Sequence, residues 1–101
     1  MGFLFGRENN HTASTSSTGA ADLAKKIRSK GGASSSGATV LLRLMEQGQD
    51  PQDLCPELAE GAARSFRDVA RKLPRDARRL AENIAASAEH ASRTGRTWTV
   101  G

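Results

Sequence analysis

The sequence is poor in the residues that usually carry chemistry. Its 101 residues include one cysteine, two histidines, one tryptophan, three phenylalanines and no tyrosine. A single cysteine, Cys55, cannot form an internal disulfide, which agrees with a reducing compartment. Together with His11 and His90 it makes too small a set for metal ligation or nucleophilic catalysis. We therefore expect no enzyme activity, no catalytic residue, no metal and no cofactor.

Long hydrophobic runs are also missing. The longest apolar stretch, around residues 40–42, is far shorter than the roughly 20 residues that cross a bilayer. The first residues, MGFLFGRE, are apolar but lack a basic segment and are too few for a secretory signal. Gly6 stands where the myristoylation pattern has serine or threonine. These absences predict a cytoplasmic protein without a transmembrane segment.

Large apolar side chains are scarce in the part of the chain that looks able to fold. Alanine occupies many of the apolar positions between residues 20 and 93, and each alanine buries little surface. A core of this kind leaves little net stability in so short a chain. We therefore expect a protein partner or self-association.

Helical spacing dominates the chain and no strand is predicted. Residues 6–19 are rich in serine, threonine and asparagine without a large apolar side chain, so residues 1–19 are predicted to form a flexible arm with an apolar tip. Apolar residues then recur at helical spacing, interrupted by glycine and proline. The sequence predicts an all-α fold, a small bundle of about four short helices over residues 20–93, with a Gly/Ser linker at about 31–37, a helix start at Pro51 and a C-terminal tail at 94–101.

The Gly/Ser linker has the glycine spacing of a phosphate-binding loop, from Gly32 to Gly37. Such a loop needs a preceding strand and a lysine that reaches the phosphates. Ala38 occupies the lysine position, and a helix is predicted before the loop instead of a strand. We interpret the segment as a linker in which Ser36 or Gly37 caps the next helix.

Charges are segregated along the chain. Residues 46–60 carry five acidic residues and no basic one, whereas residues 64–79 carry seven basic residues against Asp68 and Asp76. The basic set is Arg64, Arg67, Arg71, Lys72, Arg75, Arg78 and Arg79, and a second basic group is Lys25, Lys26, Arg28 and Lys30. On a helical wheel Arg64, Arg67 and Arg71 lie together, away from Phe66.

Three interpretations of these charges remain open. The seven-residue set could bind phosphates of a nucleic acid. It could orient a protein partner or a second copy. It could also be neutralised within its own helices, because Glu60 and Arg64, Arg78 and Glu82, and Glu89 and Arg93 are each four residues apart.

The aromatic residues are concentrated near the ends of the chain. Only Phe66 lies in a predicted helix, whereas Phe3 and Phe5 lie near the N-terminus and Trp98 in the tail. Either the ends fold back over the bundle, or they serve as anchors for a partner. In the second case, Phe3, Leu4, Phe5 and Trp98 are the predicted partner-binding residues.

Taken together, these features favour a small, non-enzymatic protein-protein interaction module, such as an adaptor or assembly protein. The alternative is a nucleic-acid-associated accessory protein that binds phosphates through residues 64–79. A disordered polar leader is also compatible with an exported, effector-like protein that leaves the cell by a non-classical route.

Overall fold

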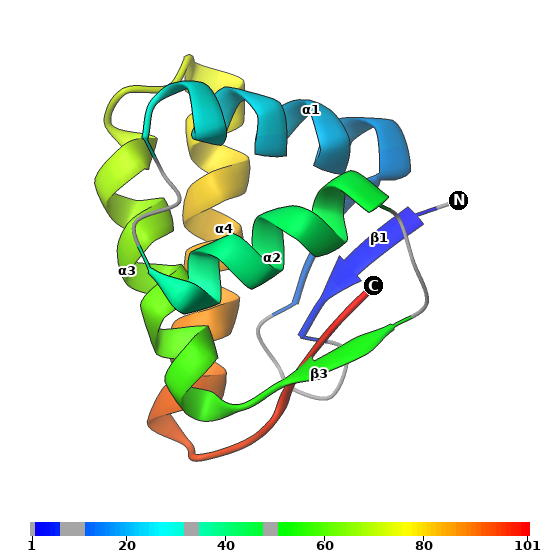
Figure 1. Cartoon of the computed structure of the whole chain (residues 1–101), viewed down its shortest axis with the longest axis vertical. Coiled ribbons are helices and arrows are strands. Elements are labelled where there is room, and N and C mark those ends of the chain that lie inside the picture. The colour runs from blue at the N-terminus through cyan, green and yellow to red at the C-terminus, as the bar shows by residue number, and fades with distance from the viewer. Residues whose placement is uncertain (1, 7–11, 32–34, 48–50) are drawn as a thin grey trace.

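The computed structural model describes residues 2–6, 12–31, 35–47 and 51–101. Within these residues it contains four helices and a four-stranded antiparallel sheet (Figure 1). The elements in chain order are β1 (Gly2–Phe5), β2 (Ala13–Ser16), α1 (Ser17–Ser29), α2 (Ser36–Gln47), β3 (Gln52–Leu54), α3 (Pro56–Ala70), α4 (Arg75–Arg93) and β4 (Trp98–Val100). The strand order in the sheet is β2-β1-β4-β3.

The prediction of an all-α fold is therefore wrong, and the fold is α+β. The residues predicted as an arm and a tail supply β1, β2 and β4, while residues 7–11 lie outside the described part. Each strand has only three or four residues, too few to show an alternating pattern in the sequence. Such strands are stabilised by pairing with distant segments, which a local pattern does not reveal.

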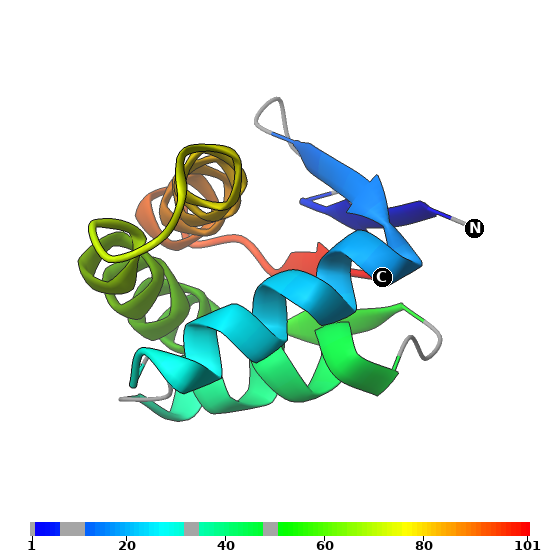
Figure 2. The same ribbon diagram turned by 90° about the horizontal axis from the view of Figure 1, so that it is seen from above.

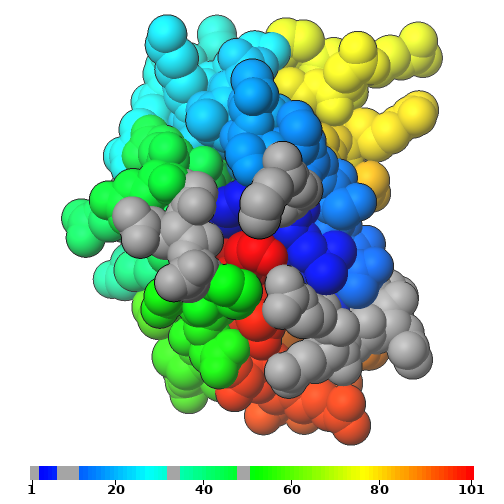
Figure 3. Space-filling model, turned by 90° about the vertical axis from the view of Figure 1, so that its right-hand side faces the viewer, coloured from blue at the N-terminus to red at the C-terminus, as the bar shows by residue number. Residues whose placement is uncertain are grey.

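The centre of the sheet joins two segments from opposite ends of the chain. Phe5 of β1 pairs with Val100 of β4. Two further backbone hydrogen bonds extend this contact, from Gly6 N to Thr99 O and from Gly101 N to Leu4 O, each at 2.8 Å. Figure 3 shows the red C-terminal segment lying beside blue N-terminal residues. β2 and β3 then complete the two edges of the sheet.

Local signals explain where the helices begin. The Ser16 hydroxyl accepts a hydrogen bond from Gly19 N at 2.9 Å and caps α1. Ser35 caps α2 in the same way, accepting from Ala38 N at 3.1 Å, so the prediction of Ser36 or Gly37 as the cap is wrong. α3 starts with Pro56, because proline tolerates the first helical position. The predicted helix start at Pro51 is wrong, since β3 follows it.

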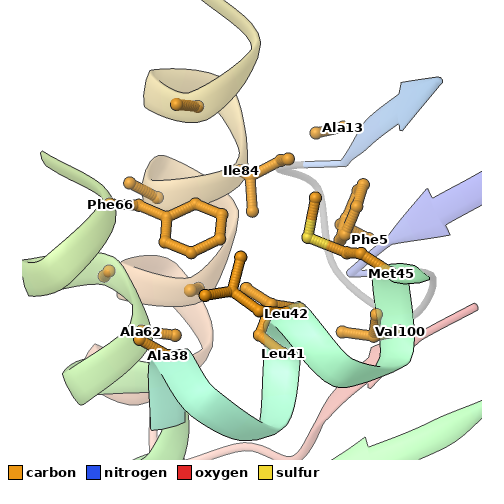
Figure 4. Packing of buried hydrophobic residues seen from close by; sticks show 14 of the residues in the cluster. Phe5, Ala13, Ala38, Leu41, Leu42, Met45, Ala62, Phe66, Ile84 and Val100 are labelled. Atoms are coloured by element: carbon orange, nitrogen blue, oxygen red, sulfur yellow. The ribbon is translucent and has the colours of Figure 1, made fainter. Parts of the chain in front are cut away.

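The core lies between the helices and the inner face of the sheet (Figures 2 and 4). In Figure 4 the Phe66 ring of α3 lies between Ile84 of α4 and Leu42 of α2, and Met45 points toward Phe5. These large side chains are almost completely buried. Alanines fill most of the remaining contacts and let α3 and α4 pack along their lengths.

Gly37 lets α2 approach the backbone of α3. A Cβ atom at this position would lie 1.9 Å from the Leu58 carbonyl oxygen and 2.9 Å from the Ala62 nitrogen. Only a residue without a side chain fits this helix crossing. Ala38 and Ala62 lie side by side at the same crossing (Figure 4). Close helix packing thus accounts for this glycine of the Gly/Ser segment.

Candidate functional site

A groove with a volume of about 570 Å³ lies between α3 and α4. Buried Ala63 and half-buried Ser92 contribute short side chains to its lining, which leaves the space open. Charged side chains surround them, four arginines and three carboxylates. We call this the α3–α4 groove, and its charged residues are Glu60, Arg64, Arg67, Asp68, Arg71, Glu89 and Arg93.

Ion pairs connect the two sides of the α3–α4 groove. Glu89 accepts from two arginines, with its Oε2 3.2 Å from Arg67 Nη2 and its Oε1 2.5 Å from Arg93 Nη2. The first of these contacts links α4 to α3. Glu60 pairs with Arg64 at 2.8 Å along α3. These side chains are between 39% and 75% exposed, so water screens each pair and a ligand can reach it.

The seven residues predicted to bind phosphate fall into three groups. Arg64 and Arg67 are engaged with carboxylates of the α3–α4 groove. Arg78 bonds to backbone carbonyls. The other four are exposed and make no ion pair within the described residues. We call these four the cationic turn, because they flank the α3–α4 connection: Arg71, Lys72, Arg75 and Arg79.

Arg78 caps the C-terminus of α3. Its Nε donates to Ala70 O at 3.1 Å, and its Nη2 donates to Arg71 O at 3.2 Å and Leu73 O at 3.4 Å. The last carbonyls of a helix lack partners within the helix and carry the negative end of its dipole. The predicted pair of Arg78 with Glu82 is therefore replaced by a structural cap, whereas the pairs Glu60–Arg64 and Glu89–Arg93 are confirmed.

The second basic group is partly neutralised by neighbouring acids. Lys26 pairs with Asp22 at 3.1 Å along α1. Arg28 forms a bidentate pair with Glu46 of α2, with Nε to Oε2 at 2.6 Å and Nη2 to Oε1 at 2.9 Å. These hydrogen bonds lower the pKa of Glu46 and raise that of Arg28. The pair therefore joins α1 to α2.

The aromatic residues predicted as partner anchors are in the core. Phe5 and Trp98 are 0% exposed and Phe3 is 3% exposed, so these three rings are not available on the surface of the folded chain. Leu4 is half-buried. The Phe5 and Trp98 rings stack with their centroids 6.2 Å apart. Of the two interpretations of the chain ends, the structure shows the one in which they cover the core.

Neither a candidate metal centre nor a candidate membrane span is found among the described residues. No group of three histidine, cysteine or acidic side chains within them could hold a metal ion. None of the helices in this part of the chain is both long enough and apolar enough to span a membrane. Cys55 is exposed with a free thiol. Residues 32–34 of the Gly/Ser segment lie outside the described part.

The sequence did not predict that Glu89 of α4 contacts an arginine of α3 in the α3–α4 groove. Glu89 and Arg93 were recognised only as a pair within one helix, although Glu89 also reaches Arg67 of α3. Nothing in a single helix predicts which neighbouring helix it packs against. The spacing of Glu60, Arg64, Arg67 and Arg71 along one face of α3 was the available signal.

The fold and the α3–α4 groove define a small α+β domain with an open, charged groove on its helical layer. Residues 7–100 match the family described as a domain of unknown function, DUF7739, and the chain belongs to this family. No curated protein and no solved structure matches the chain.

Proposed function

We propose that the protein is a non-enzymatic interaction module that binds a protein partner at the α3–α4 groove. The observation that carries this proposal is the mixture of charges in the groove, where four arginines alternate with three carboxylates on an exposed surface. Charges of both signs give a partner orientation and register more than affinity. The groove is open rather than enclosed, which suits a protein segment better than a small substrate.

The carboxylates also argue against nucleic acid in this groove. A phosphate approaching Arg67 or Arg93 would meet the negative charge of Glu89, which already pairs with both arginines. A protein partner can instead offer a carboxylate to the arginines and a basic side chain to Glu89. Each groove charge would then keep an opposite charge beside it when the partner excludes water.

The proposal is tested with variants that reverse charge in the groove. Binding partners are captured on the immobilised protein, identified by mass spectrometry and measured again in purified form by calorimetry. Changing Arg64→Glu together with Arg93→Glu should weaken binding at least tenfold while the helical circular dichroism stays unchanged. Arg96→Glu is the matched control, because Arg96 is exposed outside the groove. Equal binding by all three proteins would contradict the proposal.

The cationic turn favours a second candidate function, the binding of nucleic acid. Lys72, Arg75 and Arg79 are exposed without ion pairs in the described structure, so their charge is available to phosphates. Figure 3 shows side chains of the yellow segment around this turn standing out from the surface. Each neutralised phosphate adds to affinity and to its salt dependence.

Fluorescence anisotropy with labelled duplex DNA and single-stranded RNA tests this candidate. Changing Lys72, Arg75 and Arg79 to alanine should abolish binding or reduce the slope of log K against log salt by about one per lost contact. Arg64→Ala with Arg93→Ala is the control and should bind as the wild type does. Absence of binding by the wild-type protein at low salt would eliminate this function.

The N-terminal segment and the single cysteine bear on where the protein acts. The exported, effector-like hypothesis relied on a disordered polar leader, but residues 13–19 of that segment belong to β2 and α1. We therefore do not extend that hypothesis. The single cysteine with its free thiol supports a reducing compartment, and we propose that the interaction takes place in the cytoplasm.

A further inference from the structure

The exposed face of α3 has opposite charges at its two ends. Glu57 and Glu60 occupy the N-terminal end, where no basic residue accompanies them. Beyond Arg64, the C-terminal end and its cap residues carry mainly positive charge, including Arg71 and Lys72. All these side chains are exposed. The helix therefore presents a surface that is acidic at one end and basic at the other.

We propose that the partner at the α3–α4 groove is a second copy of this chain, with the two α3 helices packed antiparallel about a twofold axis. This inference rests on the proposed function, since it names the partner of the same surface. An antiparallel arrangement places the acidic end of each α3 against the basic end of the other. Twofold symmetry then forms every such contact twice.

Charge complementarity is what favours a second copy over an unrelated partner. Glu57 has no ion pair in the described structure, and neither does Arg71 or Lys72, so both ends hold charges that remain to be compensated. A parallel arrangement would instead bring like charges together, which is unfavourable. One helix thus provides both halves of the recognition.

The shape of the surface agrees with this arrangement. Ala63 and Ser92 have short side chains, so they leave the α3–α4 groove unfilled. The long arginine side chains of a second copy can enter this space of about 570 Å³. The groove residues are mostly charged, so the association lacks the apolar centre of an obligate dimer. The dimer is therefore expected to be reversible and sensitive to salt.

Sedimentation equilibrium of the full chain tests the proposal. The wild-type protein should show a mass that rises with concentration toward twice that of one chain at low salt. The association constant should fall on the order of tenfold at high salt. Two charge-reversed proteins are compared with it. One carries Glu57→Lys and Glu60→Lys, and the other carries Arg71→Glu and Lys72→Glu.

Each charge-reversed protein should remain a monomer alone, because both ends of its α3 then have the same sign. An equimolar mixture of the two should associate again, since the acidic α3 of one complements the basic α3 of the other. Recovery in the mixture also shows that the variants are folded. Arg96→Glu serves as the control and should associate as the wild type does.

A wild-type protein that stays monomeric at every concentration at low salt would overturn the second-copy proposal. So would a mixture that fails to associate. Neither result would affect the proposed function, because that proposal fails only if Arg64→Glu with Arg93→Glu leaves binding of other proteins unchanged. The two experiments therefore give separate answers.

Discussion

The indole N–H of Trp98 donates a hydrogen bond to the hydroxyl of Ser87 at 2.9 Å inside the core. The Ser87 hydroxyl in turn donates to the carbonyl oxygen of Phe5 at 3.3 Å. One serine on α4 thus connects β4 to β1 from beneath the sheet. It gives a polar partner to the ring that the core buries completely.

Changing Ser87→Ala should lower the free energy of unfolding by about 1–3 kcal/mol, because the buried indole N–H loses its partner. Trp98→Ala should cost more, about 3–5 kcal/mol, since it also leaves a large cavity. Urea unfolding followed by circular dichroism measures both values. Ser92→Ala on the same helix is the control and should change stability little. A Trp98→Ala protein as stable as the wild type would show that the ring is not part of the core.

The contact between α2 and α3 makes Gly37 intolerant of any side chain. Gly37→Ala should destabilise the fold by about 1–3 kcal/mol or more through overpacking, although alanine is otherwise the better helix former. Gly61→Ala provides a matched comparison in α3, because its Cβ would come no closer than 3.1 Å to the Ser35 side chain and 3.8 Å to the Gly37 nitrogen. Thermal unfolding should rank Gly37→Ala well below Gly61→Ala. The reverse order would contradict the close helix crossing.

Arg78 and Arg79 are adjacent and chemically identical but have different surroundings. Arg78→Ala should destabilise the protein by about 1 kcal/mol, because the carbonyls at the end of α3 lose their donor. Arg79→Ala should leave the free energy of unfolding within about 0.5 kcal/mol of the wild type, because the Arg79 side chain is exposed and does not bond to these carbonyls. Equilibrium denaturation distinguishes them. Similar losses at both positions would argue against a specific cap.

The Arg28–Glu46 pair predicts a pH dependence with a definite sign. Arg28 lowers the pKa of Glu46 below its ordinary value of 4.5, so folding favours the charged carboxylate. The resulting stabilisation is fully present above pH 4.5 and is lost as the pH falls through the lowered pKa of the folded state. Glu46→Gln should therefore reduce stability at neutral pH, and the difference from wild type should shrink in acid. Unfolding midpoints compared across this range test the sign.

The helices could be predicted because their apolar residues repeat locally. Ala38, Leu41, Leu42 and Met45 form one face in the sequence and are buried together in α2. The strands could not, because a pattern of three residues such as Trp98–Val100 carries no period, and all three are buried. Their structure depends on Phe5 and Asp53, which are far away in the sequence.

The charged surface was predictable in composition but not in arrangement. The excess of arginine on the exposed face of α3 followed from the helical spacing of Arg64, Arg67 and Arg71. Which arginines remain available depends on the packing of α3 against α4, since Glu89 neutralises Arg67 across that contact. The role of Arg78 depends on the turn between these helices.

The pairing of Phe5 with Val100 has a consequence for how the chain acquires its fold during synthesis. The middle of the sheet cannot assemble while β4 is still inside the ribosomal tunnel. Until then, Leu41, Leu42 and Met45 lack the aromatic ring of Trp98 that closes the core beside Phe5. Contacts between segments so far apart in sequence also form slowly. The native sheet is therefore acquired only after β4 has left the ribosomal tunnel, and ribosome-bound chains that stop short of β4 should remain sensitive to protease.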